Sequence, residues 1–249
     1  MEQRATVCGA DAARYDRSRP SYPAGLIDVL VTRPGTRVLD VGCGTGIAST
    51  LFAERGCEVL GVEPDARMAA VARNRGIEVE VARFEDWIAD GRVFDVVVSA
   101  QAWHWVDPVV GPTLARRALS RGGTLAIIWN VPRHDPAVQA AFEDLYDRFR
   151  LPDGSRCSPP GALAGGSDRF IAGIDTAGGF NAPVETTSSW SLSYTTAEWN
   201  DLLPTHSDHR LLPAQHLHGL LEATGTVIDD FGGQIEVTYT THLITAATT

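Results

Sequence analysis

The feature that most constrains the fold is a regular alternation of apolar and amphipathic segments between residues 37 and 129. Short apolar segments predict strands over 37–41, 58–63, 77–81, 94–99 and 124–129. Helical spacing predicts helices over 47–55, 64–75 and 114–119, with Gly122 and Gly123 as a turn. Strands that alternate with helices at this pitch predict an α/β fold with a doubly wound, mostly parallel sheet.

The segments outside this alternation complete the predicted fold. Residues 184–194 and 234–246 alternate in polarity and predict the last two strands, which brings the sheet to seven. Residues 1–36 are expected to be a lead-in segment or lid, and residues 37–130 the core. We expect cap insertions over 131–182 and 195–233, the first with a helix over 135–150 and a loop rich in proline, glycine and serine. We therefore predict a single domain over 1–249.

Charge and apolar content exclude two classes of partner. The chain has 21 basic and 31 acidic residues and a formal net charge of -10, so its long-range field disfavours nucleic acid. No apolar run approaches the roughly 20 residues of a membrane helix, and the first residues do not resemble a secretory leader. We expect a cytoplasmic protein, monomeric or homodimeric, that acts on a small molecule and binds no membrane.

Cysteine and histidine spacing gives no support for a metal site. The four cysteines are Cys8, Cys43, Cys57 and Cys157. They lack CxxC spacing, so free thiols are predicted. His206, Asp208 and His209 lie close together in the sequence, and His216 and His218 follow them. Their spacing fits no ligand pattern, and histidines are common on helix surfaces, so no metal is predicted.

The glycine loop after the first strand distinguishes between nucleotide ligands. Gly42, Gly44 and Gly46 alternate with other residues, whereas a dinucleotide fingerprint needs its third glycine where Ile47 stands. Asp40, two residues before the loop, would repel a pyrophosphate but can pair with an ammonium group. The loop therefore argues against a dinucleotide.

Glu63 narrows the choice of ligand further. It ends the second predicted strand about 20 residues after the loop, where an acid can accept both ribose hydroxyls of a nucleoside. Together with Asp40, this favours an adenosine ligand with an ammonium group and no phosphate, such as S-adenosylmethionine. The alternative is that the glycines are turn residues only and Glu63 is a surface carboxylate.

Several blocks resemble those of class I S-adenosylmethionine-dependent methyltransferases. These blocks are residues 38–46, 61–68 and 119–125. Residues 15–23 and 101–108 resemble the branch that includes trans-aconitate methyltransferase and many uncharacterised bacterial relatives. The resemblance, over about residues 15–130, implies a Rossmann-like methyltransferase fold, with S-adenosylmethionine as cofactor and S-adenosylhomocysteine as product. The cofactor-binding residues predicted from these blocks and from the loop are Tyr15, Arg19, Asp40, Gly42, Gly44, Gly46, Glu63, Pro64, Met68, Phe84, Glu85, Ala100 and Gln101.

The acceptor is expected where the strands end. Methyl transfer from a sulfonium is an in-line displacement, so holding the acceptor in a dry pocket supplies much of the acceleration. His104 is the candidate catalytic base, because a histidine can take a proton near neutral pH; its alternative is a structural ring between tryptophans. The candidate acceptor-binding residues are Trp103, Trp105, Trp129, Arg133, His206 and His209. Core packing is the alternative for the tryptophans, and Arg19 and Arg133 are candidate carboxylate clamps.

These observations predict a methyltransferase for a small molecule, with an oxygen acceptor, a carboxylate included, favoured over nitrogen or sulfur. Two alternatives stay open. One is a pericyclase of the same fold that uses the bound sulfonium without transferring its methyl group. The other is a non-catalytic binding module, which is disfavoured because Arg19, Gln101 and His104 stand where an acceptor would be handled.

Overall fold

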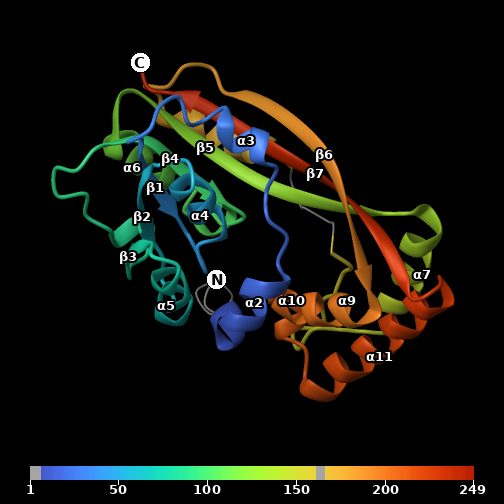
Figure 1. Cartoon of the computed structure of the whole chain (residues 1–249). Helices are drawn as coiled ribbons and strands as arrows, with labels where there is room; N and C mark the ends of the chain where they lie inside the picture. The colour runs from blue at the N-terminus through green and yellow to red at the C-terminus, as the bar shows by residue number, and fades with distance from the viewer. Residues whose placement is uncertain (1–6, 161–165) are drawn as a thin grey trace. The chain divides into compact units, whose positions relative to one another are not determined.

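The computed structural model describes residues 7–160 and 166–249 (Figure 1). Its strands form one seven-stranded sheet in the order β3-β2-β1-β4-β5-β7-β6. They are β1 (Arg37–Val41), β2 (Glu58–Val62), β3 (Glu78–Glu80), β4 (Phe94–Ala100), β5 (Leu119–His134), β6 (Val184–Thr195) and β7 (Gln234–Ala247). All neighbouring pairs among β1 to β5 are parallel. The predicted seven-stranded, mostly parallel sheet is therefore confirmed.

Helices connect the strands and precede the sheet. The α-helices are α2 (Ala12–Ser18), α3 (Ala24–Asp28), α4 (Ile47–Ala53), α5 (Ala66–Asn74), α6 (Val110–Ala118), α7 (Pro136–Tyr146), α8 (Asp168–Ala177), α9 (Thr196–Leu202), α10 (Ser207–Arg210) and α11 (Ala214–Asp230). Short 3-10 helices are η1 (Val7–Asp11), η2 (Phe84–Asp86), η3 (Trp103–Trp105) and η4 (Leu203–Thr205). Within the described residues, no helix has the length and apolar character needed to cross a membrane.

Contacts between residues divide the chain into two compact units. Unit 1 consists of Met1–Pro20, Val131–Leu163 and Ser189–Thr240, and unit 2 of Ser21–Asn130, Ala164–Ser188 and Thr241–Thr249. Strands β5, β6 and β7 each contribute one part to each unit. The expected insertion over 131–182 is shared between the units, since α8 belongs to unit 2. The division of the chain into lead-in, core and caps stays a prediction.

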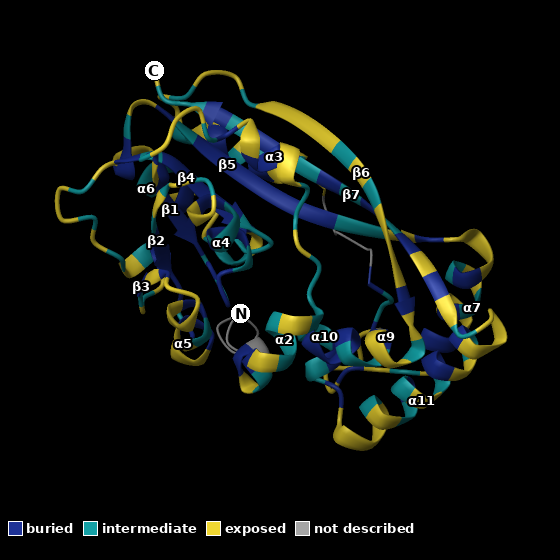
Figure 2. Cartoon of the chain, viewed as in Figure 1, coloured by how far each residue is buried: buried dark blue, intermediate teal, exposed yellow. Residues whose placement is uncertain are grey.

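The core of unit 2 is built on β1 and β4. Every residue of β1 after Arg37 is buried, as Figure 2 shows by colour. Val96 and Val98 of β4 pack in one cluster with Phe52 of α4 and Ile27 of α3. Apolar residues predominate along both strands because parallel strands in such a fold are covered on both faces.

Several predicted boundaries in unit 2 are wrong, and two of them have a clear physical reason. The predicted turn at Gly122 and Gly123 lies inside β5, where the pairing with β4 shifts register between Phe94 and Val96. Gly122 has a φ of +73°, which glycine adopts without steric cost, so the two glycines serve a bulge within a longer strand. The helix predicted from residue 64 begins at Ala66, because the Asp65 side chain caps it by accepting a hydrogen bond from the backbone N–H of Arg67.

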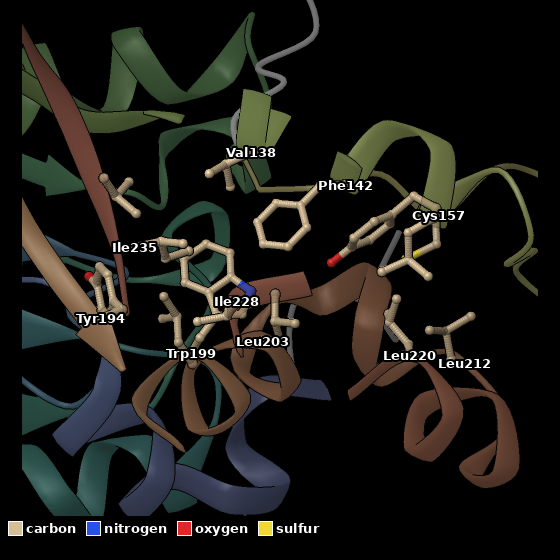
Figure 3. Close-up of a cluster of buried hydrophobic side chains, with 14 of the residues drawn as sticks. Val138, Phe142, Cys157, Tyr194, Trp199, Leu203, Leu212, Leu220, Ile228 and Ile235 are labelled. Carbon is tan, nitrogen blue, oxygen red and sulfur yellow. The ribbon is translucent and has the colours of Figure 1, made fainter. Parts of the chain in front are cut away.

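Unit 1 has its own apolar core, drawn in Figure 3. Phe142 of α7 and Trp199 of α9 stack with ring centroids 5.7 Å apart, and both side chains are fully buried. Leu220 and Ile228 of α11 join the same cluster. Large apolar side chains at helical spacing thus explain why α7, α9 and α11 pack together.

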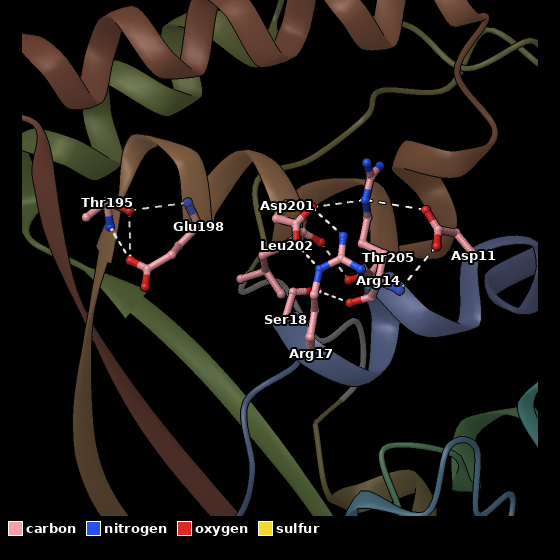
Figure 4. A network of polar contacts seen from close by, with 9 residues as sticks. All are labelled: Asp11, Arg14, Arg17, Ser18, Thr195, Glu198, Asp201, Leu202 and Thr205. Carbon is pink, nitrogen blue, oxygen red and sulfur yellow. Dashed lines mark hydrogen bonds and ion pairs between the residues drawn. The ribbon is translucent and has the colours of Figure 1, made fainter. Parts of the chain in front are cut away.

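A polar network in unit 1 attaches α2 to α9 (Figure 4). Asp201 of α9 accepts two hydrogen bonds from the Arg17 guanidinium, at 2.8 and 3.0 Å, and forms an ion pair with Arg14 at 3.1 Å. Thr195 and Glu198 form a capping box at the start of α9. These contacts position the N-terminal segment within unit 1.

Candidate functional site

The glycine loop joins β1 to α4 in unit 2. Gly42, Gly44 and Gly46 all have positive φ, at +69°, +57° and +84°, a conformation that disfavours other residues. A Cβ on Gly42 would lie 2.4 Å from the Cβ of Ala102, so space as well as conformation requires glycine there. The loop therefore exposes backbone rather than side chains, which lets a ligand approach the chain closely.

Asp40 lies in β1, just before the loop, and is fully buried. Its Oδ2 accepts a 2.6 Å hydrogen bond from Ser49 Oγ, whereas Oδ1 has no hydrogen-bond partner among the described residues. Burial raises the pKa of Asp40 to about 6, although the hydrogen bonds from Ser49 oppose that shift. A buried carboxylate with one unpaired oxygen is unfavourable unless a cation or donor reaches it.

Glu63 follows β2, and only 6% of its surface is exposed. Its Oε2 accepts a hydrogen bond from the Gly44 backbone N–H at 3.0 Å, and its Oε1 accepts one from the Asp65 N–H at 2.9 Å. Burial raises the pKa of Glu63 to about 7, the two backbone donors lower it, and the charges of Asp65 and Asp40 raise it. The structure therefore brings Glu63 and the glycine loop into direct contact.

Five further predicted cofactor-binding residues of unit 2 are buried or half-buried. Phe84 of η2 is buried against Trp87 and Trp103, with ring centroids 6.2 and 6.3 Å away. Glu85 is half-buried, and its Oε1 accepts a hydrogen bond from the Asp107 N–H at 2.9 Å. Met68 is buried, and its Cε lies 3.6 Å from the point where a Cβ on Gly44 would be. Pro64 and Ala100 are half-buried next to their strand ends.

Gln101 has an unusual backbone at the end of β4. Its φ is +60°, which costs a non-glycine residue conformational energy. The Gln101 N–H donates to Ile128 O at 2.8 Å, and its Nε2 donates to Asn130 O at 3.2 Å. The side chain of Asn130 in turn donates to Ser21 O and accepts from Thr241 Oγ1. The sequence did not identify Asn130 as a site residue. The only indication in the sequence is that Asn130 is polar and directly follows an apolar predicted strand.

His104 and two predicted acceptor-binding tryptophans share η3. Trp103 is only 4% exposed and packs on Phe84, whereas His104 is exposed and Trp105 half-buried. The rings of His104 and Trp105 lie 4.6 Å apart. The exposed imidazole is not enclosed between tryptophans, while Trp103 has a packing role in unit 2.

Trp129 is buried within the part of β5 that belongs to unit 2. Its ring stacks on His242 at 4.8 Å and meets Phe170 of α8 edge-on at 5.5 Å. His242 Nδ1 is also 2.7 Å from Glu185 Oε1. The Trp129 ring is therefore held between β7 and α8, and its role toward an acceptor stays a prediction.

The other predicted site residues belong to unit 1. Arg19 lies over the Tyr15 ring at 5.0 Å and donates to Thr205 O at 2.9 Å; its Nε is buried without a hydrogen-bond partner among the described residues. Arg133 is exposed. His206 is half-buried. Burial of the imidazole lowers the pKa of His206 well below its usual range, and the charge of Arg19 lowers it further.

The expectation of a surface histidine is wrong for His209. Its side chain is 1% exposed, with Nε2 2.7 Å from the Tyr146 hydroxyl and Nδ1 2.8 Å from Asp208 Oδ1. Burial alone would raise the pKa of Asp208, but the hydrogen bond from His209 and the neighbouring imidazoles hold it below its usual range. Sequence spacing could not reveal Tyr146 as a partner, because it is 63 residues away.

Comparison with known proteins gives a family for the central segment. Residues 39–127 match the family model described as a methyltransferase domain. A Mycobacterium tuberculosis protein named as an uncharacterised methyltransferase is 41% identical over 125 residues, 49% of this chain and 51% of the relative. A ubiquinone biosynthesis O-methyltransferase of Hahella chejuensis is 46% identical over 108 residues, 40% of this chain and 45% of the relative.

The solved structures extend the likeness beyond that segment. A provisionally assigned type II methyltransferase from Anaeromyxobacter dehalogenans aligns with a TM-score of 0.60 and 26% identity, over 91% of this chain and 97% of that chain. By sequence, the chain spans about half the length of the curated relatives it matches. Together with the strand order, these matches identify residues 39–127 as a methyltransferase domain.

Proposed function

We propose that the chain is an S-adenosylmethionine-dependent methyltransferase that acts on a small molecule. The observation that carries the proposal is the buried, unpaired Oδ1 of Asp40 next to a loop of three left-handed glycines. A ligand with an ammonium group and no phosphate satisfies such a carboxylate, whereas a pyrophosphate is repelled by it.

The contacts of Glu63 fit a ribose. Each carboxylate oxygen already accepts one backbone hydrogen bond, from Gly44 and from Asp65, and keeps a further lone pair. Two adjacent ribose hydroxyls can donate to those lone pairs, and such bonds favour the ionised form of a carboxylate whose pKa burial has raised to about 7.

In the proposed reaction, the chain binds the cofactor and the acceptor and orients them. When bound, S-adenosylmethionine supplies a methyl group on a sulfonium. Under this proposal Asp40 holds the ammonium group of the ligand, Glu63 holds its ribose, and His104 takes the proton of a neutral acceptor. An acceptor that is already an anion, such as a carboxylate, needs no base.

We infer that the acceptor atom is oxygen. The name of the Hahella chejuensis relative, an O-methyltransferase, supports this inference. The blocks at residues 15–23 and 101–108 favour the branch that includes trans-aconitate methyltransferase, and therefore a carboxylate. Nitrogen and sulfur acceptors are the alternatives. A pericyclase of the same fold and a non-catalytic binding module are the alternative functions.

Ligand binding tests the cofactor part of the proposal. Calorimetry should show one site per chain for S-adenosylhomocysteine, and Glu63→Ala should weaken it by about 1.5–3 kcal/mol, or one to two decades in affinity. Glu58→Ala, at the exposed start of β2, is the matched control and should bind as the wild type does. Unchanged affinity in Glu63→Ala would remove this role of Glu63.

Product analysis tests the transferase part. We expect S-adenosylhomocysteine to form with a panel of carboxylates, phenols, amines and thiols, and the methylated product to identify the acceptor atom. A panel member that rearranges with no S-adenosylhomocysteine formed would indicate the pericyclase, and tight binding with no conversion of any acceptor would indicate the binding module.

A further inference from the structure

Unit 1 contains a cluster of three metal-ligating side chains, of which only His209 is also a candidate acceptor-binding residue. Cys157, Asp208 and His209 each offer one ligand atom, and these atoms all lie within 4.8 Å of one another. Cys157 and His209 are buried, with 0% and 1% exposed, and Asp208 is about one-third exposed. Figure 3 shows Cys157 together with the other side chains of the apolar core of unit 1.

The local fold explains how residues 51 positions apart come together. Asp208 and His209 are neighbours in α10, where Asp208 Oδ1 accepts a hydrogen bond from the His209 backbone N–H at 2.9 Å. Cys157 comes from the loop after α7, and its N–H donates to Phe149 O at 3.4 Å. Backbone contacts therefore hold both sides of the cluster in place.

We propose that Cys157, Asp208 and His209 bind a zinc ion. A thiolate, an imidazole and a carboxylate are the donors that zinc takes in proteins, whereas Mg²⁺ and Ca²⁺ prefer oxygen alone. The thiolate and the carboxylate together balance the charge of a divalent ion. On binding, the ion replaces the proton of the Cys157 thiol, which is released to solvent.

The distances allow the three donors to close on one ion. Zinc bonds of about 2.0–2.3 Å place tetrahedral ligand atoms roughly 3.3–3.7 Å apart. The widest separation here is at most 4.8 Å, so small side-chain rotations are sufficient. The third donor, His209 Nδ1, already lies 2.8 Å from Asp208 Oδ1.

Two neighbouring residues support an ion at this place. With His209 Nδ1 on the ion, Nε2–H donates to the Tyr146 hydroxyl oxygen, 2.7 Å away, which is the outer hydrogen bond that a metal-bound histidine usually makes. The His206 ring lies 5.5 Å from the His209 ring, and its Nε2 is buried with no hydrogen-bond partner among the described residues. A second imidazole nitrogen is therefore present near His209.

Metal content of the purified, tag-free chain tests the proposal. After zinc loading and desalting, we expect about one zinc per chain, with Mg²⁺ unable to compete and the Tm raised by several degrees. Cys157→Ser and His209→Gln should lower zinc affinity by tenfold or more. The matched controls Cys57→Ser, a half-buried thiol of unit 2, and His216→Gln, exposed on α11, should keep the wild-type affinity.

A cobalt titration of the wild type keeps the test decisive if a variant fails to fold. Thiolate ligation should produce a sulfur-to-cobalt charge-transfer band in the near ultraviolet, which zinc then abolishes. A folded wild type that retains no zinc, or that binds cobalt without this band, overturns the proposal. So does a folded Cys157→Ser that binds zinc with unchanged affinity. Because S-adenosylhomocysteine binding is measured separately, failure here leaves the proposed methyl transfer untouched.

Discussion

Ser49 Oγ donates a 2.6 Å hydrogen bond to Asp40 Oδ2, and neither side chain is exposed to solvent. Ser49 is in the first turn of α4, so this bond links the strand before the glycine loop to the helix after it. It satisfies one oxygen of Asp40 and leaves the other, Oδ1, without a partner among the described residues. The carboxylate is thus fixed in direction before any ligand arrives.

The stability of the ligand-free chain should depend on pH through Asp40 and Glu63. Burial raises the pKa of Asp40 to about 6 and that of Glu63 to about 7, so the folded state binds both protons more tightly than the unfolded state. Their contribution to stability is therefore fully present below about pH 4 and is lost as pH rises to about 7, by roughly 3 kcal/mol for each group.

Urea unfolding of two variants between about pH 4 and pH 8 checks this. Asp40→Asn removes the titrating group, so its stability should fall less with rising pH than that of the wild type. Ser49→Ala removes a bond that lowers the pKa of Asp40, so its stability should fall more steeply. Parallel curves for all three proteins would show that Asp40 does not titrate in this range.

Gly42→Ala should destabilise the chain and abolish cofactor binding. The new Cβ would meet Ala102 Cβ at 2.4 Å, and φ is +69°. We expect a loss of about 2–5 kcal/mol, the sum of a left-handed residue and an overpacked contact. Gly76→Ala, with a φ of +83° and nothing within 4 Å, is the matched control and should lose only about 1–2 kcal/mol. Equal losses in thermal unfolding would show that Ala102 yields without cost.

His104→Gln should separate acceptor chemistry from structure. The imidazole is exposed in η3, so its replacement should leave the Tm and the affinity for S-adenosylmethionine nearly intact. If His104 takes the proton of the acceptor, kcat should fall at least about tenfold, and the loss should shrink as pH rises. A variant that melts early but turns over normally when folded would instead assign His104 a structural role.

Asp201→Asn should loosen α2 within unit 1. Asp201 accepts from Arg17 and pairs with Arg14, so the amide loses both ion pairs (Figure 4). We expect faster amide hydrogen exchange in Ala12–Ser18, with exchange in α11 unchanged. Asp147→Asn, which loses a pair with Arg156 elsewhere in unit 1, is the control and should not affect α2. Unchanged exchange in α2 would mean that apolar contacts alone hold this helix.

The alternation of apolar and amphipathic segments was sufficient to predict the sheet, because strands buried on both faces are apolar at most positions. β1 has the predicted bounds, and Glu63 lies directly after β2, where it accepts a hydrogen bond from the glycine loop. The bounds of β5 were not predictable in the same way. Gly122 and Gly123 favour a turn by composition, and only the pairing with β4 shows that they lie within a bulged strand.

The features that the sequence did not predict depend on contacts between residues that are far apart in the chain. Asp208 and His209 were visible as a pair, but Cys157 and Tyr146 approach them only through the packing of unit 1. The spacing rules for metal sites depend on pairs of ligands close together in the sequence, and Cys157 has no second ligand near it. The positive φ of Gln101 likewise leaves no signal in its side-chain type.

Cys43 lies in the glycine loop, so the reactivity of its buried thiol can report on the opening of that loop. Gly61 has no side chain, and a Cβ there would lie 2.5 Å from Cys43 Sγ, so the thiol fills the space that this glycine leaves in β2. Burial raises the pKa of Cys43 well above its usual range, and the charges of Asp40 and Glu63 add to the shift. The thiol of Cys43 therefore reacts with an alkylating agent only when the loop opens. The alkylation rate of Cys43 relative to that of Cys57 measures how often the loop opens without ligand. The decrease of that rate on ligand binding measures how strongly the ligand stabilises the closed loop.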